Sequence, residues 1–132
     1  LGKAKFDGAS LPRADFKRAT IEGASFTRAE LEGATFEQAT LVGARFKEAK
    51  MKGCSLSKAR GVGASFEAAD LTEAEMKRAE FAESSFTNAV LDSATFERAD
   101  LSGADLRGAK TDGTDFGKAK LDDAKRDPAK GK

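Results

Sequence analysis

Residues 24–36 read Ala24-Ser25-Phe26-Thr27-Arg28-Ala29-Glu30-Leu31-Glu32-Gly33-Ala34-Thr35-Phe36. The stretch repeats every five residues as an alanine, a polar residue, a phenylalanine or leucine, and two variable residues. The third position is called the centre below. The period decides the fold because it fits neither a straight strand nor a helix.

Residues two apart lie on the same side of an extended segment, so Ala24 and Phe26 can both point inward. The next alanine follows three residues after Phe26 and would point outward on a straight strand. A helix turns about 140° net over five residues, which would spread the apolar side chains around all its faces. The pattern therefore predicts a square coil of four short extended sides, roughly 20 residues per turn, with coils stacked about 4.8 Å apart.

The period holds along nearly the whole chain. The 26 positions from Ala4 to Ala129 in steps of five are all alanine except Cys54, Ser84 and Thr114. Every phenylalanine occupies a centre and is predicted to form the core: Phe6, Phe16, Phe26, Phe36, Phe46, Phe66, Phe81, Phe86, Phe96 and Phe116. Self-similarity at a fixed period indicates a solenoid.

Turn residues support the same coil independently. Nine glycines lie two residues after a centre, where a type II turn needs a positive φ. Gly61 is a centre without a side chain, and we expect the ring of Phe81 to fill part of that notch. Cys54 replaces an alanine and is predicted to be a buried small residue.

Residues 99–108, Ala-Asp-Leu-Ser-Gly-Ala-Asp-Leu-Arg-Gly, resemble the consensus of the pentapeptide-repeat family. The resemblance extends from about Ala4 to Ala124 and implies an all-β fold, a right-handed quadrilateral parallel β-helix of about six coils. It also implies a structural or interaction module, such as those appended to bacterial secretion adaptors and effectors. Some members of the family are DNA mimics that bind DNA gyrase.

Length and composition predict one β-helical domain at 1–124 and a basic, disordered tail at 125–132. Without a capping helix at either end, the rod is expected to belong to a larger protein or to associate end to end. The chain contains no histidine, one cysteine and no Gly-rich phosphate loop, so we predict no enzyme, no metal site and no cofactor. No membrane span or signal peptide is visible, which favours the cytoplasm.

Two outward surfaces are candidate partner sites. Positions two after every fourth centre carry Arg18, Lys58, Arg78, Arg98 and Lys118, with Gln38 as the sixth member, and are predicted to form a basic ladder along one edge. Such a ladder invites an acidic or phosphate-bearing partner. The favoured alternative is a solvated face in which Arg78 pairs with Glu75 or Glu80, and Arg98 with Asp100. The second surface is an apolar patch of Thr40, Val42, Gly61, Val62 and Ala82.

The predicted function is a non-enzymatic rod that presents side chains at fixed spacing to a protein partner. DNA mimicry is the alternative, although a net charge of +1 does not imitate a phosphate backbone. A third alternative is binding of an anion or nucleic acid through the basic ladder, with strong salt dependence; of the partner classes, we expect nucleic acid least.

Overall fold

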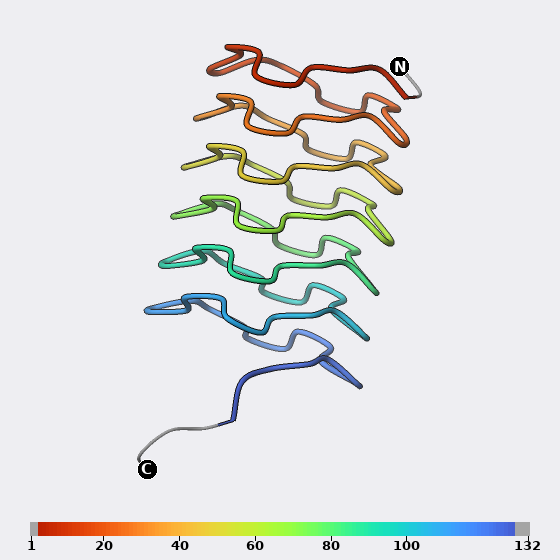
Figure 1. Ribbon diagram of the computed structural model, residues 1–132. Helices are drawn as coiled ribbons and strands as arrows, with labels where there is room; N and C mark the ends of the chain where they lie inside the picture. The colour runs from red at the N-terminus through yellow and green to blue at the C-terminus, as the bar shows by residue number, and fades with distance from the viewer. Residues whose placement is uncertain (1–2, 129–132) are drawn as a thin grey trace.

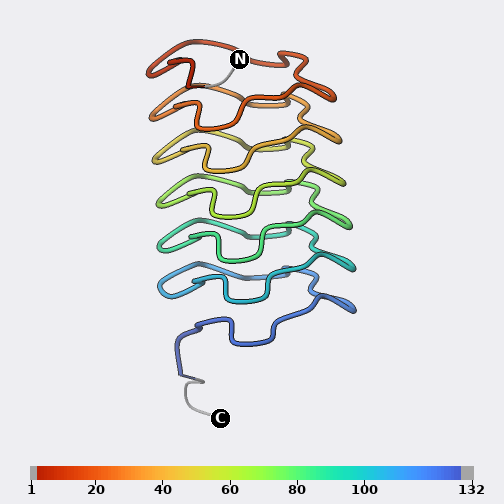
Figure 2. The same ribbon diagram turned by 90° about the vertical axis from the view of Figure 1, so that its right-hand side faces the viewer.

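The computed structural model describes residues 3–128, which form a stack of closely similar coils (Figure 1). Parallel bridges join every fifth residue to the residue 20 positions later, from Lys5↔Ser25 to Asp105↔Lys125. Each extended segment contributes a single bridging residue, and no helix is assigned within residues 3–128. The chain is a right-handed, four-sided parallel β-helix, as the sequence predicts. A view turned by 90° shows the corner loops of successive coils above one another (Figure 2).

The backbone hydrogen bonds explain the five-residue period. In the repeat around Phe26, the amides of Ser25, Phe26 and Arg28 donate to carbonyls of neighbouring coils at 2.7–2.9 Å. The amide of Ala29 closes the corner by donating to the carbonyl of Phe26 at 3.0 Å. Four of every five amides are therefore satisfied by the backbone, which leaves only the first residue of the corner to be satisfied in another way.

The core consists of the centres and the alanines, which lie inside as predicted. One column stacks the rings of Phe6, Phe26, Phe46, Phe66 and Phe86 in nearly parallel pairs with centroids 4.8–5.0 Å apart. Rings of the neighbouring column meet them edge-on. Seven of the ten phenylalanines are fully buried, whereas Phe6, Phe16 and Phe116 in the end coils are partly buried.

The notch at Gly61 is filled as predicted. A Cβ added at Gly61 would overlap the ring of Phe81. The Ser84 hydroxyl, which replaces an alanine, donates to the carbonyl of Gly61 at 2.9 Å. The replacements Cys54 and Thr114 donate to Leu31 and Leu91 carbonyls in the same way. A polar group in the alanine column is therefore satisfied by the carbonyl of the centre 23 residues earlier.

The corners differ from the prediction in one respect. All nine corner glycines have positive φ, as expected, but 16 non-glycine residues at the same turn position also have φ of 57–62°. Every coil closes its corners with this geometry, whatever residue is present. Bridge pairing continues to Lys125, one residue beyond the expected boundary at Ala124. Half of the predicted tail, 129–132, lies outside the described residues, and the disorder of the tail stays a prediction.

Candidate interaction surfaces

Where the residue before a centre is an aspartate, serine or threonine, its side chain can supply the hydrogen bond that the backbone lacks at the corner. Its side chain accepts a hydrogen bond from the amide two residues later, as Asp15 does from Lys17 at 2.9 Å and Asp70 from Thr72 at 3.1 Å. Serine and threonine hydroxyls accept the same bond at 3.3–3.4 Å. Short polar side chains are suited to such local bonds to the backbone. In these repeats the side chain before the centre stabilises the turn, so the corner side chains are freer to contact a partner.

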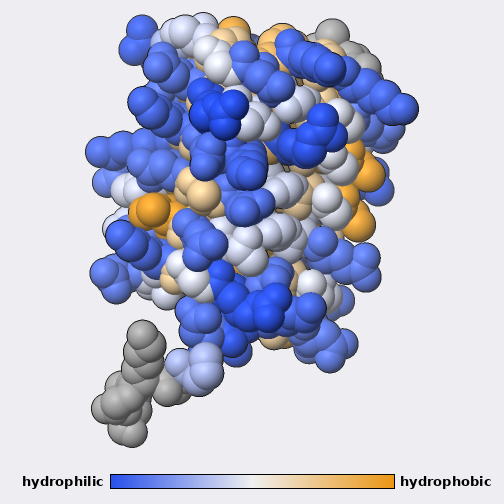
Figure 3. Space-filling model, in the orientation of Figure 1, coloured by the Kyte–Doolittle hydropathy of each residue, from blue (hydrophilic) through white to orange (hydrophobic). Residues whose placement is uncertain are grey.

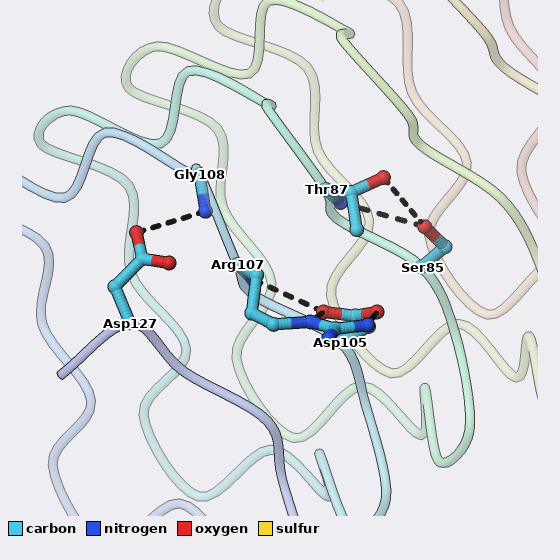
Figure 4. Close-up of polar contacts among 6 residues, drawn as sticks. All are labelled: Ser85, Thr87, Asp105, Arg107, Gly108 and Asp127. Atoms are coloured by element: carbon cyan, nitrogen blue, oxygen red, sulfur yellow. Dashed lines mark hydrogen bonds and ion pairs between the residues drawn. The ribbon is translucent and has the colours of Figure 1, made fainter.

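Figure 4 shows this arrangement near the C-terminal end. The amide of Thr87 donates to the Ser85 hydroxyl, and the amide of Arg107 donates to Asp105 at 3.1 Å. The Arg107 guanidinium also donates two hydrogen bonds to the Asp105 carboxylate, 2.7 and 2.9 Å long. These bonds lower the pKa of the Asp105 carboxyl to about 2. The Asp105–Arg107 pair therefore stabilises the corner to which both residues belong.

The predicted basic ladder lies on one corner of the rod. The 20-residue register places Arg18, Lys58, Arg78, Arg98 and Lys118 in one vertical column, and all of them are exposed. Gln38 lies in the same column between Arg18 and Lys58, and it accepts a hydrogen bond from the Arg18 guanidinium at 3.0 Å. The structure thus brings together the residues that the sequence selected, whereas their role in binding stays a prediction.

Within residues 3–128, the ion pairs predicted for the ladder are absent, since neither Arg78 nor Arg98 has a carboxylate within ion-pair distance. Glu80 pairs with Arg60 at 3.4 Å and Glu97 pairs with Lys77 at 3.9 Å, in both cases across one coil. At this corner and its flank, the stacking register places the pairing residues 20 positions apart. This part of the solvated-face alternative is wrong.

The ladder belongs to a wider basic corner made of 17–18, 37–38, 57–58, 77–78, 97–98 and 117–118. This corner holds seven cationic and two anionic side chains, a net charge of +5 on a chain whose total is +1. At its N-terminal part lies a shallow depression of about 320 Å³, lined by Lys17, Arg18, Glu37, Gln38, Ser57 and Lys58. The charge of the molecule is therefore distributed unevenly around the rod.

The apolar patch lies at another corner. Val42 and Val62 are stacked one coil apart and are 41% and 43% exposed, and they are the only large hydrophobic side chains classed as exposed among the described residues. Thr40 and Ala82 are half-buried, and Gly61 is buried beneath the surface. Gly61 therefore belongs to the core and not to the patch surface. Figure 3 shows apolar colour only in small areas of this hydrophilic face.

Sequence reasoning did not find the hollow at the C-terminal end of the rod. It measures about 700 Å³ and is lined by Asp92, Leu106, Ala109, Lys110, Thr111, Asp112, Phe116, Arg126, Asp127 and Pro128. The Asp127 carboxylate accepts a hydrogen bond from the Gly108 amide at 2.9 Å (Figure 4). The polar centres Thr111 and Arg126 were its only signal in the sequence.

Within residues 3–128, the acidic side chains are spread over the outer faces of the coils. In the described part of the chain, no group of three or more histidine, cysteine or acidic side chains is placed to hold a metal ion. Cys54 is buried, and its burial raises the pKa of the thiol to about 12. Residues 3–128 also contain no helix with the length and apolar character that a membrane crossing requires.

Comparison with known families identifies the class of repeat. Residues 29–106 match the family described as pentapeptide repeat region. A second description, pentapeptide repeats in eight copies, matches residues 1–33 and 99–126. The chain belongs to the pentapeptide-repeat family. No curated protein sequence gives a significant match.

Solved structures agree with this assignment. The pentapeptide repeat protein Rfr23 from the cyanobacterium Cyanothece 51142 is 17% identical with a TM-score of 0.73, over 96% of this chain and 86% of that one. A pentapeptide repeat protein of the Arabidopsis thaliana thylakoid lumen is 30% identical with a TM-score of 0.64. It matches 64% of this chain, which spans 59% of its length. QnrB1, a plasmid-mediated fluoroquinolone resistance protein, is 21% identical with a TM-score of 0.55, over 96% and 90% of the two chains. Rfr23 and QnrB1 bear on the fold alone.

Proposed function

We propose that this chain is a rigid, non-enzymatic protein-interaction module that presents side chains at fixed spacing. The observation that carries the proposal is the unbroken register of parallel bridges from Lys5↔Ser25 to Asp105↔Lys125 around a filled core. Side chains fixed on such a frame lose little backbone entropy when a partner binds. Membership in a larger protein or assembly, such as a bacterial secretion adaptor or effector, is part of the same proposal.

The titratable groups support a non-enzymatic role. The three carboxyls with a clear shift, Asp7, Asp100 and Asp105, all have pKa values below the usual range, because hydrogen bonds stabilise their charged forms. A general acid needs a shift in the opposite direction. The thiol of Cys54 is buried and its pKa is high, which disfavours the nucleophilic thiolate.

The test is a cross-linked pull-down from a lysate of the source cell, read by mass spectrometry. The unmodified chain is compared with the double reversal Arg78→Glu and Arg98→Glu. A matched control reverses Lys50 and Lys110 to Glu, because both are exposed side chains on another side of the rod and the change in net charge is the same. We expect one enriched partner with the unmodified chain. The absence of any specific partner would overturn the proposal and point to a spacer.

DNA mimicry is less well supported by the surface. A mimic of duplex DNA needs a dense, continuous negative charge, about one per 1.7 Å of axis. The basic corner carries a net charge of +5 along the length of the rod, which opposes this requirement. The likeness to QnrB1 concerns the fold only.

A further inference from the structure

We propose that the basic ladder binds an acidic amphipathic helix lying parallel to the rod axis. The inference rests on the proposed function, that the chain is an interaction module, and adds the surface and the chemistry of the partner. Four features of the basic corner carry it: its backbone conformation, its unneutralised charge, its narrow width and its spacing.

The backbone at the ladder is held in a conformation that favours glycine, yet no glycine is used there. All six members, Gln38 included, have φ of 57–62°. A left-handed conformation is costly for a residue with a Cβ. Each of the other three corners places glycine at this position in at least two coils. Backbone strain retained along a whole column is a reason to look for a function in its side chains.

The charge of the ladder is not neutralised within the described part of the chain. Lys58, Arg78, Arg98 and Lys118 occupy four successive levels, and none has a carboxylate within ion-pair distance there. Stacked like charges repel across neighbouring strands. A partner with carboxylates at matching heights would relieve this repulsion and would be favoured by charge complementarity.

The basic corner is narrow, because its positive charge is confined to about one corner of the rod. On one side it is bordered by a bridging column without a cation, formed by Asp15, Thr35, Ser55, Glu75, Thr95 and Asp115. On the other side, the bridging column carries Glu80 and Asp100 together with Arg60 and Lys120, so it adds no net positive charge. A nucleic-acid duplex is wide enough to bring its phosphates against these flanking carboxylates. A single stripe of carboxylates on a narrow element avoids them.

Spacing favours a helix over an extended peptide. Coils repeat about every 4.8 Å, so four levels span about 14 Å. Acidic residues on one helix face recur about every 5.4 Å, and four of them span about 16 Å. Alternate residues of a strand recur about every 6.7 Å and span about 20 Å. Long lysine and arginine side chains can absorb the first mismatch but not readily the second.

The test uses two labelled 20-residue peptides made of alanine, glutamine and five glutamates. One peptide places the glutamates as a stripe at i, i+4, i+7, i+11 and i+14, and the other distributes the same glutamates around the helix. Fluorescence anisotropy at 20 and 150 mM salt measures their binding to the intact chain. We expect the striped peptide to bind at least tenfold more tightly than the dispersed peptide at low salt.

Reversal of the ladder locates the site. Arg78→Glu with Arg98→Glu should weaken binding of the striped peptide at least tenfold, and Lys50→Glu with Lys110→Glu should change it less than threefold. The reversed chain is expected to fold, because Glu48, Glu73 and Glu83 already occupy the same turn position with positive φ. Circular dichroism of each variant checks this, and Arg78→Gln with Arg98→Gln serves as a milder second variant.

Three results would overturn the proposal: equal binding of the two peptides, loss of binding in the control and not in the ladder variants, or tighter binding of a 20-base-pair DNA duplex than of the striped peptide. A lysate partner that survives ladder reversal would remove the helix proposal and leave the interaction module intact. The absence of any captured partner would remove the proposed function, whatever the peptides show.

Discussion

Between Ile21 and Leu106 the inward side chains are sealed from solvent, whereas the same positions in the first and last coils remain partly exposed. The repeat is the same in both regions. Stacked rings occur in both regions, from Phe6 on Phe26 to Phe96 on Phe116, but an end coil has a neighbouring coil on one side only. The comparison teaches that burial in this fold comes from neighbouring coils.

The largest difference between the regions should appear in the phenylalanine core. Phe46 is fully buried between Phe26 and Phe66, so Phe46→Ala should lower the free energy of unfolding by about 3–5 kcal/mol through the cavity it leaves. Phe116→Ala, in the last coil, should cost less than about 2 kcal/mol because the ring is only partly buried. Urea unfolding followed by circular dichroism measures both, and equal losses would remove the distinction.

A smaller effect is expected from filling the notch in the middle. Gly61→Ala would drive a Cβ into the ring of Phe81 and should destabilise the fold by about 1–3 kcal/mol. When Gly61→Ala is combined with Phe81→Leu, the smaller side chain should leave room for the added Cβ, and the double variant should recover part of this loss. A double-mutant cycle should then give a favourable coupling energy above about 0.5 kcal/mol.

Gly117→Ala is the matched control for Gly61→Ala. Gly117 lies in the last coil, has no positive φ, and an added Cβ would meet only an Asp115 carboxylate oxygen. We expect Gly117→Ala to change the free energy of unfolding of the protein by less than about 0.5 kcal/mol. Similar losses at the two glycines would mean that packing against Phe81 is not the cause.

The smallest expected effect is a change in the stability of the fold at acid pH. Because the Arg107 side chain lowers the pKa of the folded Asp105 carboxyl to about 2, the unfolded chain binds its proton first as the pH falls. The contribution of this pair is therefore complete above about pH 4 and is lost progressively towards pH 2. Asp105→Asn should lower the thermal midpoint slightly at pH 6 and not at pH 2. A constant difference between the two chains across this range would contradict the assignment.

The fold could be predicted almost completely because its information is local and periodic. The inward position of Phe46, the 20-residue register and the filling of Gly61 by Phe81 all follow from counting residues. The positive φ of Arg78 could not be foreseen from its residue type, because the hydrogen bonds of the stacked coils impose that turn whatever residue occupies it.

The candidate site was predicted less well than the fold. The column from Arg18 to Lys118 follows from the register, but the pairing of its neighbours does not follow from sequence distance. Glu80 lies two residues from Arg78 but pairs with Arg60, one coil away. The hollow near Phe116 and Arg126 depends on how the last residues lie, for which the repeat gives no rule.

The 20-residue register has a consequence for changes in chain length. An insertion of 20 residues adds one coil and leaves every column in place. An insertion of five residues preserves the alternation of core and surface, but it moves every later residue to the next side of the square. The basic ladder would then break into two segments on adjacent corners, while the alternation of inward and outward positions stays intact. In this fold, a change in length by one five-residue repeat rotates the later part of the chain by a quarter turn about the rod axis. Evolution can therefore redistribute a binding surface by adding or deleting a single repeat.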